Sequence, residues 1–296
     1  MLLVPFTNVA ANYGNEATLT IIFVNDRHGR MDADAHIAYI VQNTTGNVLL
    51  LDAGDTVHGQ TTAILTRGAA MVELMNAVGY SAMVAGNHEF NFGAKRLVEL
   101  TEMMDFPLLS ANVFTEDGNM LFQPYEIFHM DGITVGIFGI TTPETVRKTD
   151  PRNVAGLTFE CPTKVAVEMV YTLNTHGVDF IIALTHLGID EESLPEHRSD
   201  TLAEIPGIHL IVDGHSHLRL EMGLFVGDTL IVQAYEHGKY IGVVEIIFSG
   251  GEISMVARLI EVTDELPICE EILGKIAALD DAIENITGEV IGQFPR

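Results

Sequence analysis

Five predicted strands of this chain end directly in side chains that can bind metal ions. Each strand is a short apolar run that passes at once into a polar turn. The junctions are Leu19–Val24 before Asn25-Asp26-Arg27-His28-Gly29, Val48–Leu51 before Asp52-Ala53-Gly54-Asp55, Met83–Ala85 before Gly86-Asn87-His88-Glu89, Phe180–Leu184 before Thr185-His186, and Leu210–Val212 before Asp213-Gly214-His215-Ser216-His217. In open α/β sheets, ligands bind at the carboxyl ends of strands, so we expect these loops to meet at one site.

Segments of helical period alternate with the apolar runs, which is the pattern of a β-sheet covered by helices. Helices are predicted at Gly68–Val78, Lys95–Met104 and Val165–Asn174, and a further strand at Ile133–Ile140. The pattern then changes to strands separated by glycine-containing turns, namely Thr229–Gln233, Gly242–Phe248 and Ile253–Leu259. These strands predict a β-rich second half of the core, followed by one amphipathic helix over Cys269–Ile286. The chain is therefore predicted to be of the α/β class.

The residue types in the five loops are those that transition metals bind. Imidazole, carboxylate and amide oxygen suit Mn, Zn, Fe or Co, and the two cysteines, Cys161 and Cys269, form no C-x-x-C pair. Two neighbouring ions need one bridging carboxylate and separate ligands for each ion. The sequence offers Asp26, His28 and His217 for a first ion, Asn87, His186 and His215 for a second, and Asp55 as the bridge.

A pair of divalent ions held in this way would act on a phosphate ester. Two ions, two ligand carboxylates and one hydroxide leave about one positive charge, which attracts a phosphate monoester. Metal coordination lowers the pKa of water, so a metal-bound hydroxide can attack phosphorus near neutral pH. We expect Asn87 and His88 at the substrate, with His88 stabilising the transition-state oxygens or protonating the leaving group.

The charge of the chain limits its partners. It has 41 Asp and Glu against 15 Lys and Arg, a formal net charge of −26, and no Lys/Arg cluster, so a nucleic-acid polymer is excluded as a partner. Small phosphorylated molecules remain possible, because bound metal ions reverse the field locally. No apolar run reaches the ~18 residues that span a bilayer. No Lys or Arg lies near the start, so we expect neither a membrane span nor an intact secretory signal.

The other polar residues fit structural roles. Asp52 and Asp213 are expected to accept hydrogen bonds from loop amides or to orient an imidazole. Two histidines lie closer to the motifs: His58 follows Asp55 by three residues, and His237 lies in a glycine-flanked turn. We expect both to lie outside the site. Five more histidines are expected at helix ends, on the surface or in the core: His36, His129, His176, His197 and His209.

The motifs together resemble those of a known family. Asp26-x-His28, Gly54-Asp55, Gly86-Asn87-His88-Glu89, His186 and Gly214-His215-x-His217 resemble the calcineurin-like metallophosphoesterase superfamily. The fuller strings Asn25–Gly29, Leu51–Asp55 and Gly86–Phe90 look like the branch of bacterial 5'-nucleotidases, UDP-sugar hydrolases and 2',3'-cyclic phosphodiesterases. The resemblance implies a four-layer αββα sandwich with two mixed β-sheets, the metal-ligand scheme given above, nucleotides as the favoured substrates, and an extracellular or periplasmic location.

The resemblance also implies a division of the chain. Residues 1–17 would be an N-terminal extension and residues 18–268 the catalytic domain. Residues 269–296 would form a long helix and tail similar to the connector to a C-terminal nucleotide-binding domain. In the family that domain supplies aromatic side chains for the nucleotide and arginines for phosphate, and it is missing here. We therefore expect a complete metal centre beside an incomplete substrate pocket.

One catalytic position departs from the family pattern. An Asp commonly stands three residues after the catalytic histidine and pairs with it, whereas this chain has Asn91 there. An amide can orient His88 but cannot stabilise its protonated form, so we expect weaker acid catalysis. Two other functions remain open, namely hydrolysis of a sulfur ester, as in the related thiosulfohydrolase branch, and a non-catalytic role as a metal-stabilised binding domain.

Overall fold

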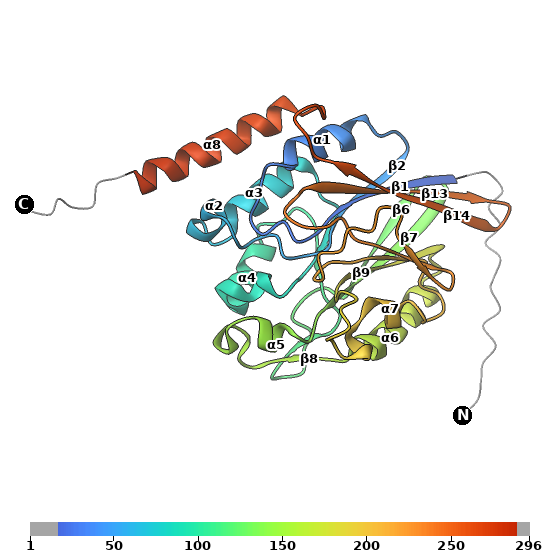
Figure 1. Cartoon of the computed structure of the whole chain (residues 1–296). Helices are drawn as coiled ribbons and strands as arrows, with labels where there is room; N and C mark the ends of the chain where they lie inside the picture. The colour runs from blue at the N-terminus through green and yellow to red at the C-terminus, as the bar shows by residue number, and fades with distance from the viewer. Residues whose placement is uncertain (1–16, 289–296) are drawn as a thin grey trace, which may run out of the picture.

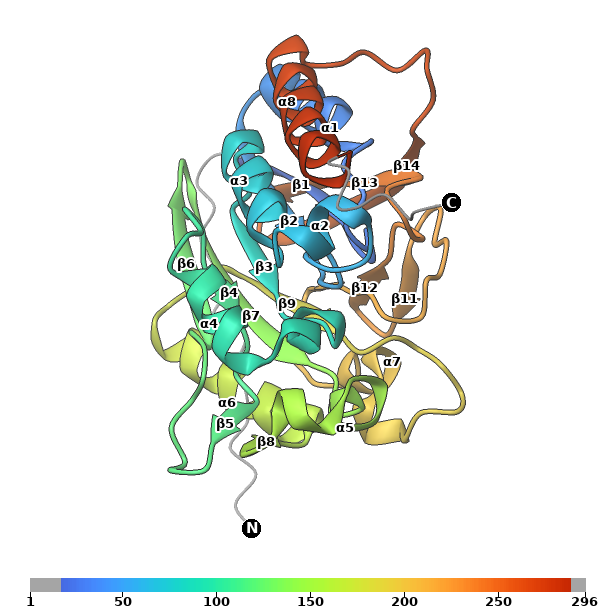
Figure 2. The same ribbon diagram turned by 90° about the vertical axis from the view of Figure 1, so that its left-hand side faces the viewer.

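The computed structural model describes residues 17–288 and shows two β-sheets stacked face to face, with helices on both outer surfaces (Figure 1, Figure 2). This is a four-layer αββα sandwich, so the expected fold is confirmed. The predicted N-terminal extension, except for Ala17, lies outside the described residues, as do residues 289–296 of the predicted tail. Within the described part, no helix is long and apolar enough to cross a membrane.

The first sheet contains six strands in the order β14-β13-β1-β2-β3-β4. Strands β1 to β4 are parallel, whereas β13 runs antiparallel to β1 and pairs with β14 in a hairpin. The carboxyl ends of β1, β2 and β3 therefore lie at the same edge. The bounds are β14 (Glu252–Glu261), β13 (Tyr240–Ser249), β1 (Ala17–Val24), β2 (Asn47–Asp52), β3 (Ala82–Val84) and β4 (Leu108–Leu109).

The second sheet also contains six strands, in the order β11-β12-β10-β9-β7-β6. Its four central strands are parallel, and the two edge strands β11 and β6 are antiparallel to their neighbours. The bounds are β11 (Leu224–Val226), β12 (Thr229–Val232), β10 (Leu210–Val212), β9 (Phe180–His186), β7 (Ile133–Thr141) and β6 (Tyr125–Met130). A separate two-stranded sheet joins β5 (Val113–Thr115) to β8 (Leu157–Phe159).

Helices cover the outer face of each sheet (Figure 2). Those over the first sheet are α1 (Asp34–Asn43), α2 (Thr61–Leu65), α3 (Ala69–Val78), α4 (Ala94–Thr101) and α8 (Glu270–Thr287). Those over the second sheet are α6 (Pro162–Thr175) and α7 (Ser199–Leu202). The shorter helical segments are α5 (Thr145–Lys148), η1 (His88–Phe92), η2 (Pro151–Val154) and η3 (Pro195–His197).

Strand β1 shows why the strands of this chain are apolar at nearly every position. Ile21 and Phe23 point between the two sheets, into the core that holds the sheets together. Ile22 points the other way and packs under the helices. Because successive side chains of a strand face opposite sides, a strand in an inner layer is buried on both faces and needs a continuous apolar run.

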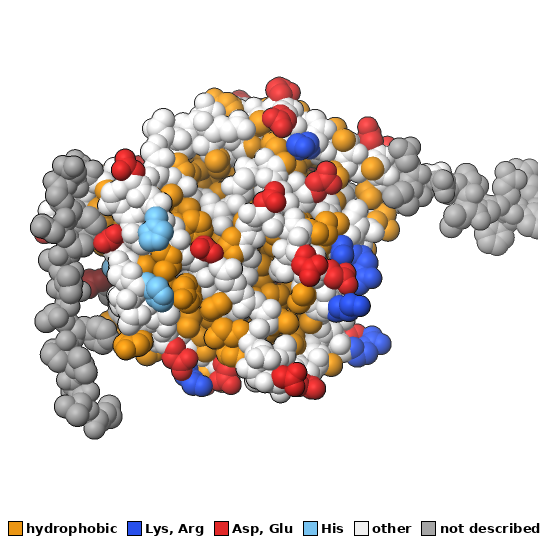
Figure 3. Space-filling model, turned by 180° about the vertical axis from the view of Figure 1, so that it is seen from behind, with side chains coloured by type: hydrophobic (Ala, Val, Ile, Leu, Met, Phe, Trp, Pro, Cys, Tyr) orange, Lys and Arg blue, Asp and Glu red, His pale blue; other side chains and the backbone are white. Residues whose placement is uncertain are grey.

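The acidic excess of the chain is spread over its surface. On the face seen in Figure 3, Asp and Glu side chains are scattered, and most of the Lys and Arg side chains lie along one edge. Several basic side chains pair with acidic neighbours in exposed positions, as Arg258 does with Glu245. The acidic side chains therefore form a solvated surface. Exposed ion pairs of this kind contribute little to the stability of the fold.

The structure differs from the sequence-based expectation in the second half of the chain. The three strands predicted as a β-rich half do not form one unit, because β12 joins the second sheet while the β13–β14 hairpin completes the first. Strand β6 was not predicted, since Tyr125–Met130 is an edge strand whose residues are largely half-buried and carry no apolar run. The long C-terminal helix is present, and it packs against α1 and α3.

A buried ion pair fixes the loop that follows β1. Arg27 is fully buried, and its Nη1 donates to both carboxylate oxygens of Asp34 at 2.7 Å. The Arg27 Nε lies 3.4 Å from an oxygen of Asp52, at the end of β2. The guanidinium thus ties the β1 loop, the start of α1 and the end of β2 into one unit beneath the strand ends.

We expect Asp34→Asn to destabilise the protein by about 3 kcal/mol, because removing one partner of a buried ion pair leaves the other charge uncompensated. Chemical denaturation of wild type and variant measures the difference in unfolding free energy. Asp32→Asn is the matched control, since Asp32 is exposed and 3.9 Å from Arg30, and it should cost less than about 0.5 kcal/mol. Equal losses from both substitutions would contradict the role assigned to Asp34.

Candidate metal centre

The polar loops after the five predicted strands meet at one place between the two sheets. The loop after β1 is bonded to the loop after β2, because Asp26 N donates to Gly54 O at 2.9 Å and His28 N to Asp55 O at 2.8 Å. The loop after β10 joins them, since His215 N donates to Asp26 Oδ2 at 3.0 Å. Segments nearly two hundred residues apart in the chain are therefore held in direct contact.

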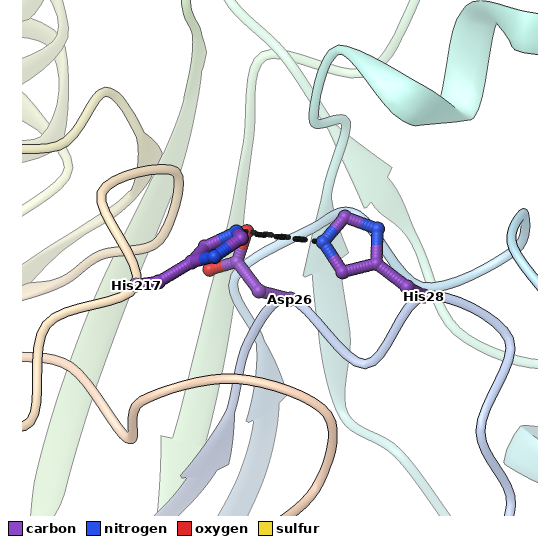
Figure 4. A group of neighbouring side chains, drawn as sticks. All are labelled: Asp26, His28 and His217. Atoms are coloured by element: carbon purple, nitrogen blue, oxygen red, sulfur yellow. Dashed lines mark hydrogen bonds and ion pairs between the residues drawn. The ribbon is translucent and has the colours of Figure 1, made fainter.

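The first group of candidate ligands is Asp26, His28 and His217 (Figure 4). The three side chains point toward one another from the ends of β1 and β10. His217 Nε2 lies 3.1 Å from Asp26 Oδ1 and 3.4 Å from His28 Nε2. One ligand atom from each residue falls within 4.8 Å of the others, which is the spacing that a single metal ion requires.

The second group is Asp55, His186 and His215, and it adjoins the first. His186 Nε2 lies 3.1 Å from Asp55 Oδ2 and 3.9 Å from Asp26 Oδ1. Asp55 also belongs to a third grouping, with His28 and His88. Its carboxylate therefore faces the ligands of both groups, which is the position of a bridging ligand.

The residues in these groups fit divalent metal ions. Asn87 Oδ1 is buried and has no hydrogen-bond partner among the described residues, which is costly unless another group binds it. The ring nitrogens that face away from the centre are tied, because His186 Nδ1 bonds to Ala53 O at 2.7 Å and His217 Nδ1 lies 2.9 Å from Glu236 Oε2. Histidines that bind metals are held in this way by their second nitrogen.

The backbone at the centre is strained. Non-glycine residues rarely adopt positive φ angles, and the cost of each is about 1–3 kcal/mol. Five of the seven candidate ligands do so, with φ between 50° and 75°: Asp26, His28, Asp55, His215 and His217. Such clustering is typical of functional sites, where the surrounding structure holds strained loops in place.

Glu89 is a functional residue that sequence reasoning passed over, although it completes the Gly86-Asn87-His88-Glu89 motif. It is fully buried and its carboxylate accepts four backbone N–H groups, from Asp55, Thr56, Val57 and Gly86, at 2.7–3.1 Å. Burial and the charge of Asp55 raise the pKa of Glu89 to about 7, while the backbone donors favour the ionised form. Glu89 thereby fixes the loop that carries Asp55 against the loop that carries Asn87.

His88 lies beside the two ligand groups. Its backbone N donates to Asp55 Oδ1 at 2.7 Å, and its ring meets the ring of His28 edge-on at 5.1 Å. Asn91 Nδ2 lies 2.7 Å from His88 Nδ1, and Asn91 Oδ1 accepts a hydrogen bond from Thr149 at 2.7 Å. The structure therefore places the amide of Asn91 against Nδ1 of His88, between that ring and Thr149.

The expectation that His58 and His237 lie outside the site is wrong. His58 stacks on His88 with ring centroids 6.0 Å apart, and its Nδ1 lies 3.1 Å from the same Asn91 amide. His237 lies 5.4 Å from His28, ring to ring, and its backbone N donates to Asp26 O at 2.8 Å. His237 depends on a loop that tertiary contacts bring in, whereas His58 lies on the same loop as Asp55 and only its contacts with His88 and Asn91 are tertiary.

The other polar residues behave as expected. Asp52 accepts hydrogen bonds from Gly54 N and Thr56 Oγ1, and Asp213 accepts them from Leu187 N and Gly188 N. Within residues 17–288, the five histidines predicted to be structural make no contact with the candidate ligands: His36, His129, His176, His197 and His209.

The histidines among the candidate ligands differ in protonation, because each ligand group contains one histidine whose pKa is lowered and one whose pKa is raised. Burial lowers the pKa of His28 to about 4, so its ring is neutral and ready to bind a metal ion. Burial acts in the same direction on His186, but the charges of Asp55 and Asp26 outweigh it and raise the pKa of His186 to about 10. In the absence of a metal ion, His186 therefore carries a positive charge where a cation would otherwise be attracted.

A comparison with protein families identifies the chain. The model of the family described as calcineurin-like phosphoesterases matches residues 19–219, which include all seven candidate ligands. The chain belongs to the calcineurin-like phosphoesterase family. The resemblance that the motifs suggest is thereby confirmed, and the αββα sandwich is the fold in which this phosphoesterase domain presents its loops.

Relatives of this calcineurin-like phosphoesterase include 5'-nucleotidases. The 5'-nucleotidase of Vibrio cholerae is 31% identical over 280 residues, covering 81% of this chain and 50% of that protein. A structure of the 5'-nucleotidase precursor from Thermus thermophilus has a TM-score of 0.77 at 29% identity, covering 93% of this chain and 61% of that one. The phosphoesterase YfkN from Bacillus subtilis shares the fold with a TM-score of 0.81 at 24% identity, over 93% and 100% of the two chains. The chain thus spans about half the length of the curated relatives it matches.

Metal binding should release protons, chiefly from His186. Its pKa of about 10 means that the ring is protonated near neutral pH, and a histidine must lose its proton to bind a metal ion. Affinity should therefore rise with pH, by up to about tenfold per pH unit for each proton displaced, until the pH reaches the pKa. Calorimetric titration with Zn²⁺ in buffers of different ionisation enthalpy counts the protons.

His28→Ala is the control for this measurement. It should weaken binding without changing the number of protons released, because His28, with a pKa of about 4, is already neutral. An affinity that is independent of pH would contradict the protonated state assigned to His186.

Proposed function

We propose that this chain hydrolyses phosphate esters at a dinuclear metal centre. The observation that carries the proposal is the pair of adjoining ligand groups that share Asp55, with His88 beside them. Divalent ions bound there would supply a hydroxide nucleophile near neutral pH and would act as Lewis acids on a phosphoryl oxygen. Asp26, His28 and His217 would hold one ion, Asn87, His186 and His215 the other, and Asp55 both.

The ligand chemistry favours transition metals. The set combines imidazole and carboxylate with one amide oxygen and contains no thiolate, which suits Mn, Zn, Fe or Co. Because the chain has a net charge of −26, attraction for an anionic ester would have to arise at the centre itself rather than from the surface. This agrees with a small phosphorylated substrate and disfavours a nucleic-acid polymer.

His88 is the proposed proton donor. Asn91 Nδ2 lies 2.7 Å from His88 Nδ1, and an amide N–H can only donate, so Nδ1 accepts and the proton of the neutral ring is on Nε2. The neutral ring would thus donate a hydrogen bond from Nε2 to a phosphoryl oxygen, and to protonate the leaving group His88 would first have to take up a second proton. Asn91 positions the ring but brings no negative charge to stabilise an imidazolium, so proton donation would be weaker than with a carboxylate partner.

Nucleotides are the proposed substrates, by analogy with the relatives named 5'-nucleotidase. Residues 18–268 would be the catalytic domain, and residues 269–296 would resemble the connector to a nucleotide-binding domain. Without such a domain, the catalytic domain would hydrolyse simple esters and would bind nucleotides poorly. A micromolar KM for a nucleoside monophosphate, measured with this chain alone, would contradict the incomplete pocket.

The direct test is hydrolysis of p-nitrophenyl phosphate by the metal-loaded chain. We expect the wild type to be active. In His88→Ala the activity should fall by about 10²-fold or more, which is the usual contribution of a general acid, while elemental analysis still finds two metal ions. His129→Ala is the control, because His129 is exposed on β6, away from the site. Metal content without hydrolysis would favour a binding domain, and hydrolysis of a sulfur ester alone would favour a thiosulfohydrolase.

Asn91→Asp should increase turnover and extend activity to higher pH. A carboxylate in place of the amide would stabilise the protonated form of His88, so the acid form would persist over a wider pH range. The pH dependence of kcat for the two proteins measures this effect. Identical profiles would contradict the role given to Asn91.

A further inference from the structure

The loop between β12 and β13 is a sixth loop of the metal centre, although it supplies none of the seven candidate ligands. Ala234 N donates to Asn25 Oδ1 at 2.7 Å, and Asn25 Nδ2 donates to Tyr235 O at 2.6 Å. His237 N donates to Asp26 O at 2.8 Å. The loop is thus bonded on both sides of Glu236 to the residues that begin the first ligand group.

The backbone of this loop is strained in the same way as the ligand loops. Tyr235 and His237 have φ angles of 67° and 61°, in the left-handed region that non-glycine residues rarely adopt. The two residues flank Glu236. Strain of this kind persists only where the surroundings fix a conformation, and here the result is that the side chain of Glu236 turns toward the ligand His217.

The two carboxylate oxygens of Glu236 contact different partners. Its Oε2 lies 2.9 Å from His217 Nδ1 and 3.4 Å from His237 Nε2, while Oε1 accepts a bond from Lys239 at 2.9 Å. Lys239 therefore holds one oxygen and leaves the other for the imidazoles.

Glu236 decides which nitrogen of His217 can bind a metal ion. A neutral imidazole has one proton, and a carboxylate that accepts a bond from Nδ1–H keeps the proton there. The lone pair is then on Nε2, the atom that lies 3.1 Å from Asp26 Oδ1. The His217 ring is 35% exposed, so without Glu236 it would be free to turn or to move its proton to Nε2.

We propose that Glu236 is a positioning residue for His217, and that it strengthens binding of the ion held by Asp26, His28 and His217. The inference rests on the dinuclear centre of the proposed function. Loss of such a carboxylate partner typically weakens metal binding by about 10–100-fold. Glu236→Gln keeps an oxygen that can accept the Nδ1–H bond, so it should retain most of the affinity that Glu236→Ala loses.

Calorimetric titration of the metal-free chain with Mn²⁺ tests the proposal without any substrate. We expect two ions in the wild type, with one of them bound about 10–100-fold more weakly in Glu236→Ala and the other unchanged. Glu221→Ala is the matched control, since Glu221 is an exposed carboxylate that, like Glu236, pairs with a basic side chain, in this case Arg219. It should bind both ions as the wild type does.

A double-mutant cycle separates a positioning role from direct metal ligation. If Glu236 acts through His217, then adding Glu236→Ala to His217→Ala should cause no further loss of affinity. Additive losses would overturn the proposal and make Glu236 a ligand, and unchanged affinity in Glu236→Ala would overturn it as well. A wild-type chain that binds fewer than two Mn²⁺ would instead contradict the dinuclear centre, and with it the proposed function.

Discussion

The rest of the site depends on the contacts that the carboxylate of Asp55 makes. It accepts a hydrogen bond from His88 N, lies 3.1 Å from His186 Nε2, and belongs to two of the three ligand groups. Desolvation of a carboxylate is costly unless neighbouring groups compensate it. In this protein the compensation comes from both sheets, so the site exists only where the two sheets meet.

The surroundings of Asp55 are built to hold that charge in place. Glu89 binds the backbone N–H of Asp55 and of its two successors, which fixes the strained turn. Beneath it, the buried pair of Arg27 and Asp34 ties the β1 loop to α1. Neither Glu89 nor Asp34 is among the candidate ligands, yet both determine where the ligands can lie. Because they fix the loops, the backbone strain at five of the seven candidate ligands can persist.

Two residues outside the seven candidate ligands act on the histidines of the site. Asn91 offers its amide to His88 and His58 alike, where a carboxylate would hold a charged imidazole. Glu236 brings a carboxylate to His217 from a loop outside the strand-end pattern. In the proposed mechanism, Asn91 would weaken proton donation and Glu236 would strengthen metal binding. Together they describe a centre in which the metal ions, more than the histidine beside them, would carry the chemistry.

The sequence alone indicated the buried strands and the polar residues that follow them, because apolar runs specify buried strands and polar turns at their ends specify the edge where ligands gather. The four layers were expected only from the resemblance to the family. The sequence could not place β12 and the β13–β14 hairpin in different sheets, since strand pairing depends on contacts distant in the chain. Nor could it find Glu89, His58, His237 or Glu236 as parts of the site. Their positions arise from hydrogen bonds between separate loops, as in the bond from His237 N to Asp26 O, and only the folded chain forms those.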